Sequence, residues 1–300
     1  MDKIGFVVLH YMLIEDTIQC IESIQKRIDT KNYCIVIVDN ASPNNTGVRL
    51  MDTYSMSSEV TVLLNMKNEG FARGNNVGIQ YAREVLHCKY VVVLNNDTYL
   101  IQDDFYKVIT EEYEYSHFAI LGPRIASPNE YEICNPMRFE PYNRDEIAKL
   151  KKRLVCLIIL NYLGLENTFF SLKKWFEAKF YKQRDIRRKA KWKKEYKILK
   201  AKQYKRHENV QLNGCCFVLS DLFFEVFQGL DTRTFMYFEE AILYEQMIKT
   251  KLLTVYNPKL RIYHKESAST DAVYKTKRKI RKFTYKNCLA SLKILAQYVD

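Results

Sequence analysis

The segment YVVVLNNDTYL, residues 90–100, joins a short run of β-branched residues to an abrupt polar ending. Residues 91–94 are Val-Val-Val-Leu, a pattern typical of a strand buried on both faces. Two amides, one carboxylate and one hydroxyl follow at once, at residues 95–98. In open α/β sheets ligands bind beyond the carboxyl ends of the strands, so this ending is a candidate site.

Three similar apolar runs precede this segment at intervals of about 25 to 30 residues. They are IGFVVL (4–9), CIVIV (34–38) and VTVLL (60–64). Helical patterns lie between the runs, over residues 14–28, 47–56 and 71–86. Strands that alternate with helices predict βαβ crossovers, and therefore an α/β fold with an open, doubly wound, mostly parallel sheet flanked by helices.

Length and composition are those of a folded protein. The chain has 300 residues, 47% hydrophobic and 13% aromatic, and is compatible with one large α/β domain bearing an appendage or with two domains. The eight cysteines show no CxxC pair or zinc-type spacing, and several lie in apolar runs, which favours reduced thiols in a core. Met1 leads straight into an apolar strand, so we expect no signal peptide and a cytoplasmic protein.

The net charge of +12 is concentrated in one segment. Residues 144–206 contain 21 Lys and Arg against 6 Asp and Glu, so the rest of the chain is slightly acidic. The same segment carries the apolar stretches LVCLIILNYLGL (154–165) and FFSLKKWF (169–176). A run of this length is too short for a transmembrane helix, which needs about 20 residues, but it suits a helix lying in a membrane interface.

Three interpretations of this basic segment remain open. It can attach the protein peripherally to an anionic membrane surface. It can also form a helical hairpin that packs on the core and turns a basic face to solvent. Binding of nucleic acid is the third interpretation, which is disfavoured because no recognition module is visible.

Polar residues gather where the four predicted strands end. The first strand ends at His10, the second at Asp39, the third runs into residues 65–78 and the fourth into Asp97. Because the carboxyl ends of parallel strands meet at one edge, we expect a polar site built from these loops. Asp39 can accept from a pyrimidine base or a ribose hydroxyl, although a turn or a helix cap would also place an Asp there.

The stretch NEGFARGNNVG, residues 68–78, opens a helix with glycines at Gly70, Gly74 and Gly78. Glycines let a phosphate approach the backbone near a helix N-terminus, and Arg73 adds a charged donor. The spacing matches neither the P-loop nor the dinucleotide fingerprint.

Asp97 completes this candidate site as a ligand for a divalent cation. Such a cation needs only one or two protein carboxylates when substrate phosphates supply the other oxygens. Asn95 and Asn96 would then order the turn or contact a sugar. The alternative is that Asp97 caps the helix that starts near Asp103.

Together, VVLHY, VIVDNASPN, NEGFARGNNVGI and VVLNNDT resemble the nucleotide-sugar-binding half of family 2 glycosyltransferases of the GT-A fold, in family order over residues 4–98. The likeness is to the rhamnosyltransferase-like branch of bacterial surface-polysaccharide synthesis. It implies that Asp39 binds the base or ribose and that Asp97 holds Mg²⁺ or Mn²⁺ against the diphosphate. The first carboxylate of the family's Asp-x-Asp motif is Asn95 here. The residues assigned to nucleotide-sugar binding are His10, Asp39, Asn68, Gly70, Phe71, Arg73, Gly74, Asn75, Asn95 and Asn96.

The later chain resembles the acceptor side of the same family. NGCCFVLS (213–220) is similar to the strand beside the acceptor site, and FMYFEEAILYEQM (235–247) is similar to the start of the helix that bears Glu-Asp-x-Asp-Leu. Both family aspartates are changed, to Glu240 and Ile242. The likeness makes Glu240 the expected catalytic base, with Glu239 in reserve, although a Glu pair also suits a helix N-terminus.

IYHKESAST (262–270) is similar to the family's His followed by a Ser-containing loop. The resemblance implies that His264 contacts the metal or the diphosphate. An amphipathic helix is expected over residues 282–299, where it can cover the active site or touch a membrane.

The resemblance implies an inverting, metal-dependent transfer of sugar from dTDP-rhamnose or a UDP-sugar to a lipid-linked or polysaccharide acceptor, at the inner face of the cell membrane. The expected parts are a nucleotide-sugar-binding half (1–143), a basic helical insertion (144–207) and an acceptor-side half with the last helix (208–300). Two alternatives remain: a catalytically impaired binding or scaffold subunit, and another nucleotide-binding α/β enzyme such as a nucleotidyltransferase. No residue pattern indicates an oligomeric state.

Overall fold

The computed structural model describes residues 2–128, 134–180, 196–266 and 276–299. Its strands are β1 (Ile4–His10), β2 (Tyr33–Asp39), β3 (Val60–Leu64), β4 (Tyr90–Asn95), β5 (Thr98–Leu100), β6 (Ile120–Ala126), β7 (His207–Glu208), β8 (Cys216–Leu219) and β9 (Thr254–His264). Its helices are α1 (Ile14–Arg27), α2 (Thr46–Thr53), α3 (Gly70–Gln80), α4 (Phe105–Ser116), α5 (Arg144–Leu163), α6 (Glu166–Phe180), α8 (Asp221–Phe224), α9 (Glu239–Thr250) and α11 (Lys277–Leu295), with a π-helical turn η1 (Tyr81–Val85) after α3.

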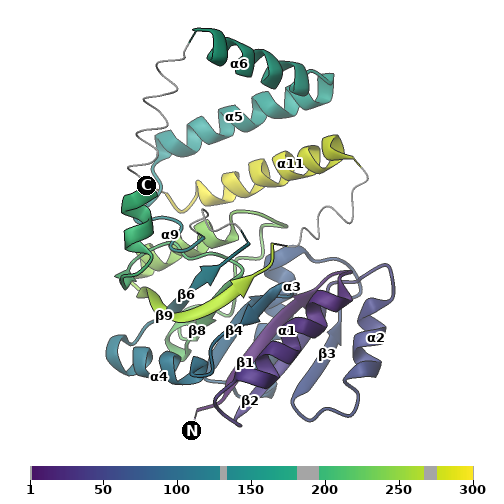
Figure 1. Ribbon diagram of the computed structural model, residues 1–300, viewed down its shortest axis with the longest axis vertical. Helices are drawn as coiled ribbons and strands as arrows, with labels where there is room; N and C mark the ends of the chain where they lie inside the picture. Colours follow the sequence, from purple (N-terminus) through teal and green to yellow (C-terminus); the bar gives the residue numbers. More distant parts are fainter. Residues whose placement is uncertain (1, 129–133, 181–195, 267–275, 300) are drawn as a thin grey trace.

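The described strands form one sheet in the order β3-β2-β1-β4-β8-β6-β9-β5, with β7 beside β9. The first four strands are parallel, β8 runs antiparallel to both of its neighbours, and β9 is parallel to β6. Because β8 lies between β4 and β6, the early and late parts of the chain share a single sheet (Figure 1). The expected α/β fold with a mostly parallel sheet is confirmed.

Alternation along each buried strand divides the core into two layers. Phe6 and Val8 of β1 face Ile21 and Ile24 of α1, whereas Val7 packs with residues of α3 on the opposite face. Successive side chains of a strand point to opposite faces, so continuous apolar strands require helices on both sides of the sheet. This is why the sequence runs identified above are apolar throughout.

A helical layer lies beyond the end of the sheet that is opposite to the N-terminus (Figure 1). Ile147 of α5 and Ala241 of α9 pack with Leu292 and Leu295 of α11. The side chain of Asn143 caps the start of α5 by accepting from Glu146 N–H at 2.9 Å. The described part of the basic insertion therefore packs on the body of the protein through α5, and its segment 181–195 lies outside the described residues.

Within the described residues, no single helix is long and apolar enough to cross a membrane. The pair formed by Arg144–Leu163 and 166–176 meets the length and composition criteria when taken together, but it is bent by 118°.

Three helices differ from the sequence prediction by more than two residues at one or both ends. Helix α2 ends at Thr53 rather than at residue 56. The predicted helix 71–86 ends its α-helical part at Gln80 and closes with the π-helical turn η1, in which Leu86 N–H reaches Tyr81 O. The last helix begins at Lys277 rather than at 282, because the side chain of Thr276 accepts from Lys279 N–H and caps a polar first turn. The helical pattern over 71–86 does not distinguish a π-helical turn from an α-helix. The polar first turn of α11 lies before the apolar pattern on which the prediction of 282–299 was based.

Candidate active site

The ends of the parallel strands lie side by side at one edge of the sheet. Residue pairing places His10 opposite Asp39 and Leu9 opposite Asn95. The turn that carries Asp97 therefore begins beside the end of β1. The structure brings these strand ends together as the sequence predicts, and the chemical roles of the residues stay predictions.

The loop after β2 holds the Asp39 carboxylate against its own backbone. Ser42 N–H donates to both carboxylate oxygens, at 3.2 and 3.3 Å, and the residue is 5% exposed. Gly47 in the first turn of α2 makes room for this group, since a Cβ there would lie 2.3 Å from the carboxyl carbon of Asp39. Asp39 is thus oriented by its loop, as short polar side chains in turns often are.

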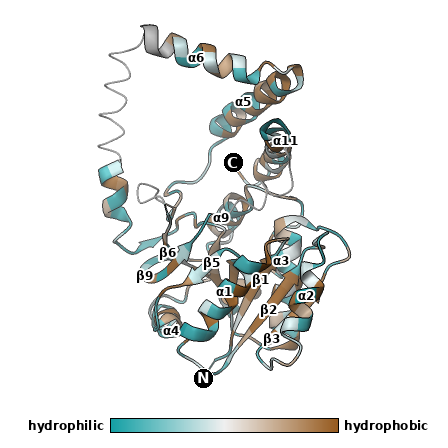
Figure 2. Cartoon of the chain, turned by 45° about the vertical axis from the view of Figure 1, so that its right-hand side comes forward, coloured by the Kyte–Doolittle hydropathy of each residue, from teal (hydrophilic) through white to brown (hydrophobic). Residues whose placement is uncertain are grey.

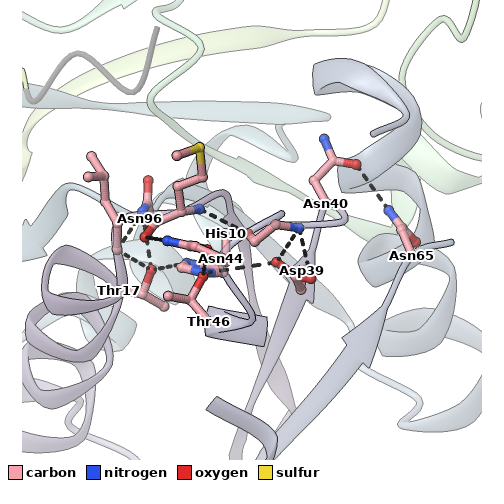
Figure 3. Close-up of polar contacts among 11 residues, drawn as sticks. His10, Thr17, Asp39, Asn40, Asn44, Thr46, Asn65 and Asn96 are labelled. Atoms are coloured by element: carbon pink, nitrogen blue, oxygen red, sulfur yellow. Dashed lines mark hydrogen bonds and ion pairs between the residues drawn. The ribbon is translucent and has the colours of Figure 1, made fainter. Parts of the chain in front are cut away.

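His10 is fully buried and connects the first turns of two helices (Figure 3). Its Nδ1 lies 2.7 Å from the hydroxyl of Thr17 on α1, and its Nε2 lies 2.8 Å from the hydroxyl of Thr46 on α2. Burial lowers the pKa of His10 to about 4, although the Asp39 carboxylate 3.9 Å away acts in the opposite direction. We infer that His10 is a neutral ring that positions the starts of α1 and α2, because both of its nitrogens contact hydroxyls of these helices.

The same network reaches the turn after β4. Asn96 donates to the hydroxyl of Thr17 at 3.1 Å and to Leu13 O at 3.4 Å, so it orders the turn before Asp97 (Figure 3). The sequence did not single out Thr17 or Thr46. A Thr on an amphipathic helix and a Thr at a helix start are ordinary features, and their role depends on a partner that is distant in sequence.

Asn40 ties the loops after β2 and β3 together. Its amide donates to Asn68 Oδ1 at 3.1 Å and to Gly70 O at 3.0 Å. Its oxygen accepts from Asn65 Nδ2 and from Glu69 N–H (Figure 3). The predicted contact between Asn68 and the nucleotide sugar therefore competes with a hydrogen bond inside the protein. Asn40 was not selected from the sequence, because Asp39 immediately before it was the more prominent candidate.

The start of α3 differs from the sequence expectation. Gly70 N–H donates to Asn68 Oδ1 at 2.9 Å and Phe71 N–H donates to Phe235 O at 2.8 Å, so these amides bond protein atoms. A Cβ on Gly70 would lie 2.1 Å from Phe235 O, and its φ of +79° also favours glycine. The space beside Gly70 is taken by the carbonyl of a residue distant in sequence, and the approach of a phosphate to the start of this helix stays a prediction.

The remaining residues of the glycine-rich stretch also contact protein. Arg73 Nε donates to Thr232 O at 2.7 Å, while its side chain is 53% exposed. A Cβ on Gly74 would lie 2.7 Å from a methyl group of Leu9, so this glycine allows α3 to pack closely on β1. Asn75 is buried and donates to a carbonyl one turn earlier in α3. The predicted contacts of these three residues with a nucleotide sugar stay predictions.

Asp97 and His264 form the pair that the sequence assigned to a metal. His264 Nε2 lies 3.2 Å from Asp97 Oδ1, and the side chains are 17% and 8% exposed. Antiparallel pairing of β5 with β9 places Thr98 opposite His264, and Lys265 N–H donates to Asp97 O at 3.0 Å. Asp97 and His264 are 167 positions apart in the chain, and the pairing of β5 with β9 brings them together.

This pair fits a divalent cation that is shared with a phosphorylated substrate. A carboxylate oxygen and an imidazole nitrogen lie close enough to ligate one ion, and the other positions would be left for phosphate oxygens and water. Within the described residues no group of three or more His, Cys, Asp and Glu side chains could hold a metal. The structure therefore fits a metal that binds with the substrate better than a metal held by protein alone.

The predicted catalytic base lies at the start of α9. Two residues with left-handed backbone, Tyr237 (φ 76°) and Phe238 (φ 66°), precede the helix, and such strain is common at functional sites. Glu240 is partly exposed, and burial raises the pKa of its carboxyl group. A Cβ on Gly214 would lie 3.8 Å from Glu240 Oε2 and 3.8 Å from the ring of Phe71, so the base faces the start of α3.

The segment around Gly214 also connects Glu240 to the turn that carries Asp97. Its neighbour Cys215 accepts through its carbonyl from Asn95 N–H at 2.9 Å, two residues before Asp97. The chain segment that lies beside Glu240 is thus bonded to the strand that carries the metal-binding turn.

Glu239 is the less exposed of the two residues. It is 8% exposed, and its Oε1 has no hydrogen-bond partner among the described residues. Burial, followed by the charge of Glu240, raises the pKa of Glu239 to about 7. Near neutral pH this group is therefore partly protonated, and its burial leaves it less accessible to an acceptor than Glu240.

We expect the raised pKa of Glu239 to make the protein less stable as the pH rises. A carboxyl group whose pKa moves from its ordinary 4.5 to about 7 on folding stabilises the fold below pH 4.5, and that contribution is lost as the pH passes 7. The loss is at most about 3 kcal/mol. Urea unfolding at several pH values should show it in the wild type and not in Glu239→Gln, and equal pH dependence in both proteins would contradict the assignment.

Comparisons with known proteins agree with this fold. Low-salt glycan biosynthesis hexosyltransferase Agl10 of Haloferax volcanii is 26% identical over 125 residues, which cover 42% of this chain and 37% of that protein. The crystal structure of S. aureus TarS 1-349 aligns with a TM-score of 0.53 and 12% identity, over 88% of this chain and 60% of the other. The chain therefore matches less than two thirds of the length of either protein, and the structural likeness shows the fold alone.

The curled, mostly parallel sheet flanked by helices is consistent with the GT-A fold. A model described as glycosyl transferase family 2 matches residues 7–221, which is more than two thirds of the chain. The chain belongs to glycosyl transferase family 2.

Proposed function

We propose that this chain transfers a sugar from a nucleoside-diphosphate sugar to a hydroxyl group of a lipid-linked or glycan acceptor, with inversion at the anomeric carbon. The observation that carries the proposal is the contact between Asp97 and His264, at the edge of the sheet where Asp39 ends its strand. The family supports the transfer reaction. The motifs over residues 4–98 support dTDP-rhamnose or a UDP-sugar as the donor.

In this proposal the donor lies across the strand ends. Asp39 accepts from the base or the ribose, and its orientation by Ser42 N–H prepares it for that contact. Asp97 and His264 would hold Mg²⁺ or Mn²⁺ next to the diphosphate. The chemistry that such a cation supplies is neutralisation of the charge on the leaving diphosphate.

Glu240 removes the proton of the acceptor hydroxyl while that oxygen attacks the anomeric carbon on the face opposite the diphosphate. Its partial exposure leaves it accessible to an acceptor, and the pKa raised by burial makes it a stronger base than an ordinary carboxylate. Gly214 keeps the space beside its carboxylate open.

We propose that the enzyme works in the cytoplasm at the inner face of the membrane, with the three parts 1–143, 144–207 and 208–300 described above. All eight cysteines are free thiols, which suits a reducing compartment. The helices α5 and α11 begin in the second and third parts, respectively, and pack together beside α9.

A thermal-shift screen of nucleoside-diphosphate sugars against nucleoside triphosphates, with and without Mn²⁺, tests the proposal. A ligand present well above its dissociation constant should raise the melting temperature by about 5 °C. We expect the largest shift with a nucleoside-diphosphate sugar and Mn²⁺ together. A shift with nucleoside triphosphates alone would favour a nucleotidyltransferase and contradict the proposal.

A further inference from the structure

Helix α6 exposes apolar side chains that a helix of a water-soluble domain normally buries. Every described side chain from Asn167 to Phe176 is exposed, without a buried face. The large apolar members of this stretch are Phe169 (42% exposed), Phe170 (40%), Leu172 (51%), Trp175 (51%) and Phe176 (50%). Single exposed apolar residues are ordinary, but a contiguous group of this size marks an interaction surface.

These side chains follow a helical repeat. In α6, Phe169, Leu172 and Phe176 recur at intervals of three and four residues, so they share one face, and Lys174 lies on the opposite side. The pattern is that of an amphipathic helix whose apolar face is left in water.

The adjoining part of α5 has the same character. Val155, Ile159 and Tyr162 also recur at intervals of four and three residues, and they are 44%, 52% and 78% exposed. Figure 2 shows the corner between the two helices in brown, the colour of hydrophobic residues. We call the exposed apolar residues of α5 and α6, from Val155 to Phe176, the corner surface.

Positive charge accompanies the corner surface. Lys152 and Arg153 are exposed just before its first residue on α5, and Lys173 and Lys174 are exposed within α6. The segment 144–206 carries 21 basic and 6 acidic residues in all. An apolar face flanked by Lys and Arg is complementary to an anionic lipid surface, where apolar side chains enter the acyl boundary and the cations meet the headgroups.

The junction between α5 and α6 is fixed to helix α11 by a buried carboxylate. Glu166, 2% exposed, accepts from Asn161 at 2.8 Å and from Tyr285 of α11 at 2.6 Å, and it lies 3.1 Å from Arg281 Nε. Arg278 of α11 donates to Asn161 O at 2.8 Å. These bonds fix the direction of α6 relative to α11.

Helix α11 in turn packs on the helix of the candidate base. Leu292 and Leu295 of α11 contact Ile242 of α9, two residues after Glu240. A partner bound to the corner surface would therefore have a defined orientation with respect to the active site.

We propose that the corner surface docks onto the interface of an anionic lipid bilayer, lying in the interface without crossing it. The 15 residues of α6 span about 22 Å, which is shorter than a bilayer core, and the two helices are bent by 118°. Lipid is favoured over a protein partner because large aromatic residues and Lys occur together along the exposed length of α6. The docking itself requires neither the donor nor the transfer reaction.

Sedimentation of the full chain with vesicles tests the proposal. Vesicles of phosphatidylcholine with phosphatidylglycerol should carry the wild type down, and vesicles of phosphatidylcholine alone should carry much less. The triple variant Phe169→Ser, Leu172→Ser, Phe176→Ser should lower the bound fraction roughly tenfold or more. A charge variant, Lys173→Glu with Lys174→Glu, should lose binding to the anionic vesicles selectively.

The matched control changes three exposed apolar residues elsewhere: Val48→Ser, Met51→Ser and Met56→Ser, at positions 49%, 39% and 95% exposed on and after α2. This control should bind vesicles like the wild type. The proposal is overturned if the wild type stays in the supernatant with anionic vesicles, or if the triple variant binds as the wild type does.

Two further outcomes would also overturn the proposal. One is a wild-type dimer in light scattering that the triple variant separates into monomers, with no vesicle binding. The other is binding to single-stranded RNA in place of vesicles. Because donor turnover is measured separately, loss of docking is distinguishable from failure of the proposed reaction.

Discussion

Replacing Asp97 by alanine should lower the rate of sugar transfer by roughly a thousandfold or more. Asp97 supplies the carboxylate of the pair with His264, and the described residues offer no group of three or more metal-binding side chains to replace it. Without the cation, the negative charge that develops on the leaving diphosphate would not be neutralised. Steady-state turnover at saturating Mn²⁺ measures the effect.

Asp103→Ala is the matched control for this substitution. Asp103 is 79% exposed and pairs with Arg27 on the surface, so its loss should leave turnover unchanged. Circular dichroism and thermal melting should show that both variants fold. Near-normal transfer by Asp97→Ala would remove the metal-site assignment.

Glu240→Gln should lower kcat by roughly a hundredfold to ten-thousandfold and leave donor binding nearly unchanged. Glutamine keeps the size of the side chain but cannot accept the proton of the acceptor hydroxyl. Calorimetric titration with the donor, beside kcat with saturating acceptor, separates binding from chemistry. In the wild type kcat should rise with pH through the raised pKa of Glu240, because the base works in its ionised form.

Two controls accompany Glu240→Gln. Glu225→Gln changes an exposed carboxylate outside the site and should retain full activity. Glu239→Gln should reduce kcat far less than Glu240→Gln, since Glu239 is buried whereas Glu240 is partly exposed to an acceptor. If Glu239→Gln has the larger effect instead, the base is Glu239.

The strands and their polar ends were predictable because the signal is local. The runs at 4–9, 34–38, 60–64 and 90–94 are apolar on both faces, and parallel pairing then requires their carboxyl ends to meet. From that rule alone, Asp39 and Asp97 were predicted to lie at the same edge of the sheet. The contact with His264 came from resemblance to the family, and no local pattern predicted it.

The start of α3 shows what local patterns leave out. The glycine at Gly70 predicted a close approach of some group, and a close approach is present, but the group is the carbonyl of Phe235. The buried bonds of His10 to Thr17 and Thr46 are likewise contacts between elements. Tertiary partners of this kind depend on how helices pack on the sheet, which periodicity does not specify.

The central proposal is that Asp97 holds a divalent cation next to a diphosphate. Mn²⁺ binding followed by electron paramagnetic resonance tests this most directly. The wild type is titrated with Mn²⁺ in the presence of uridine or deoxythymidine diphosphate, with the nucleotide alone as the reference. We expect the wild type to lower the signal of free Mn²⁺ below the reference, and Asp97→Ala not to lower it. Equal binding of Mn²⁺ by the two proteins would contradict it.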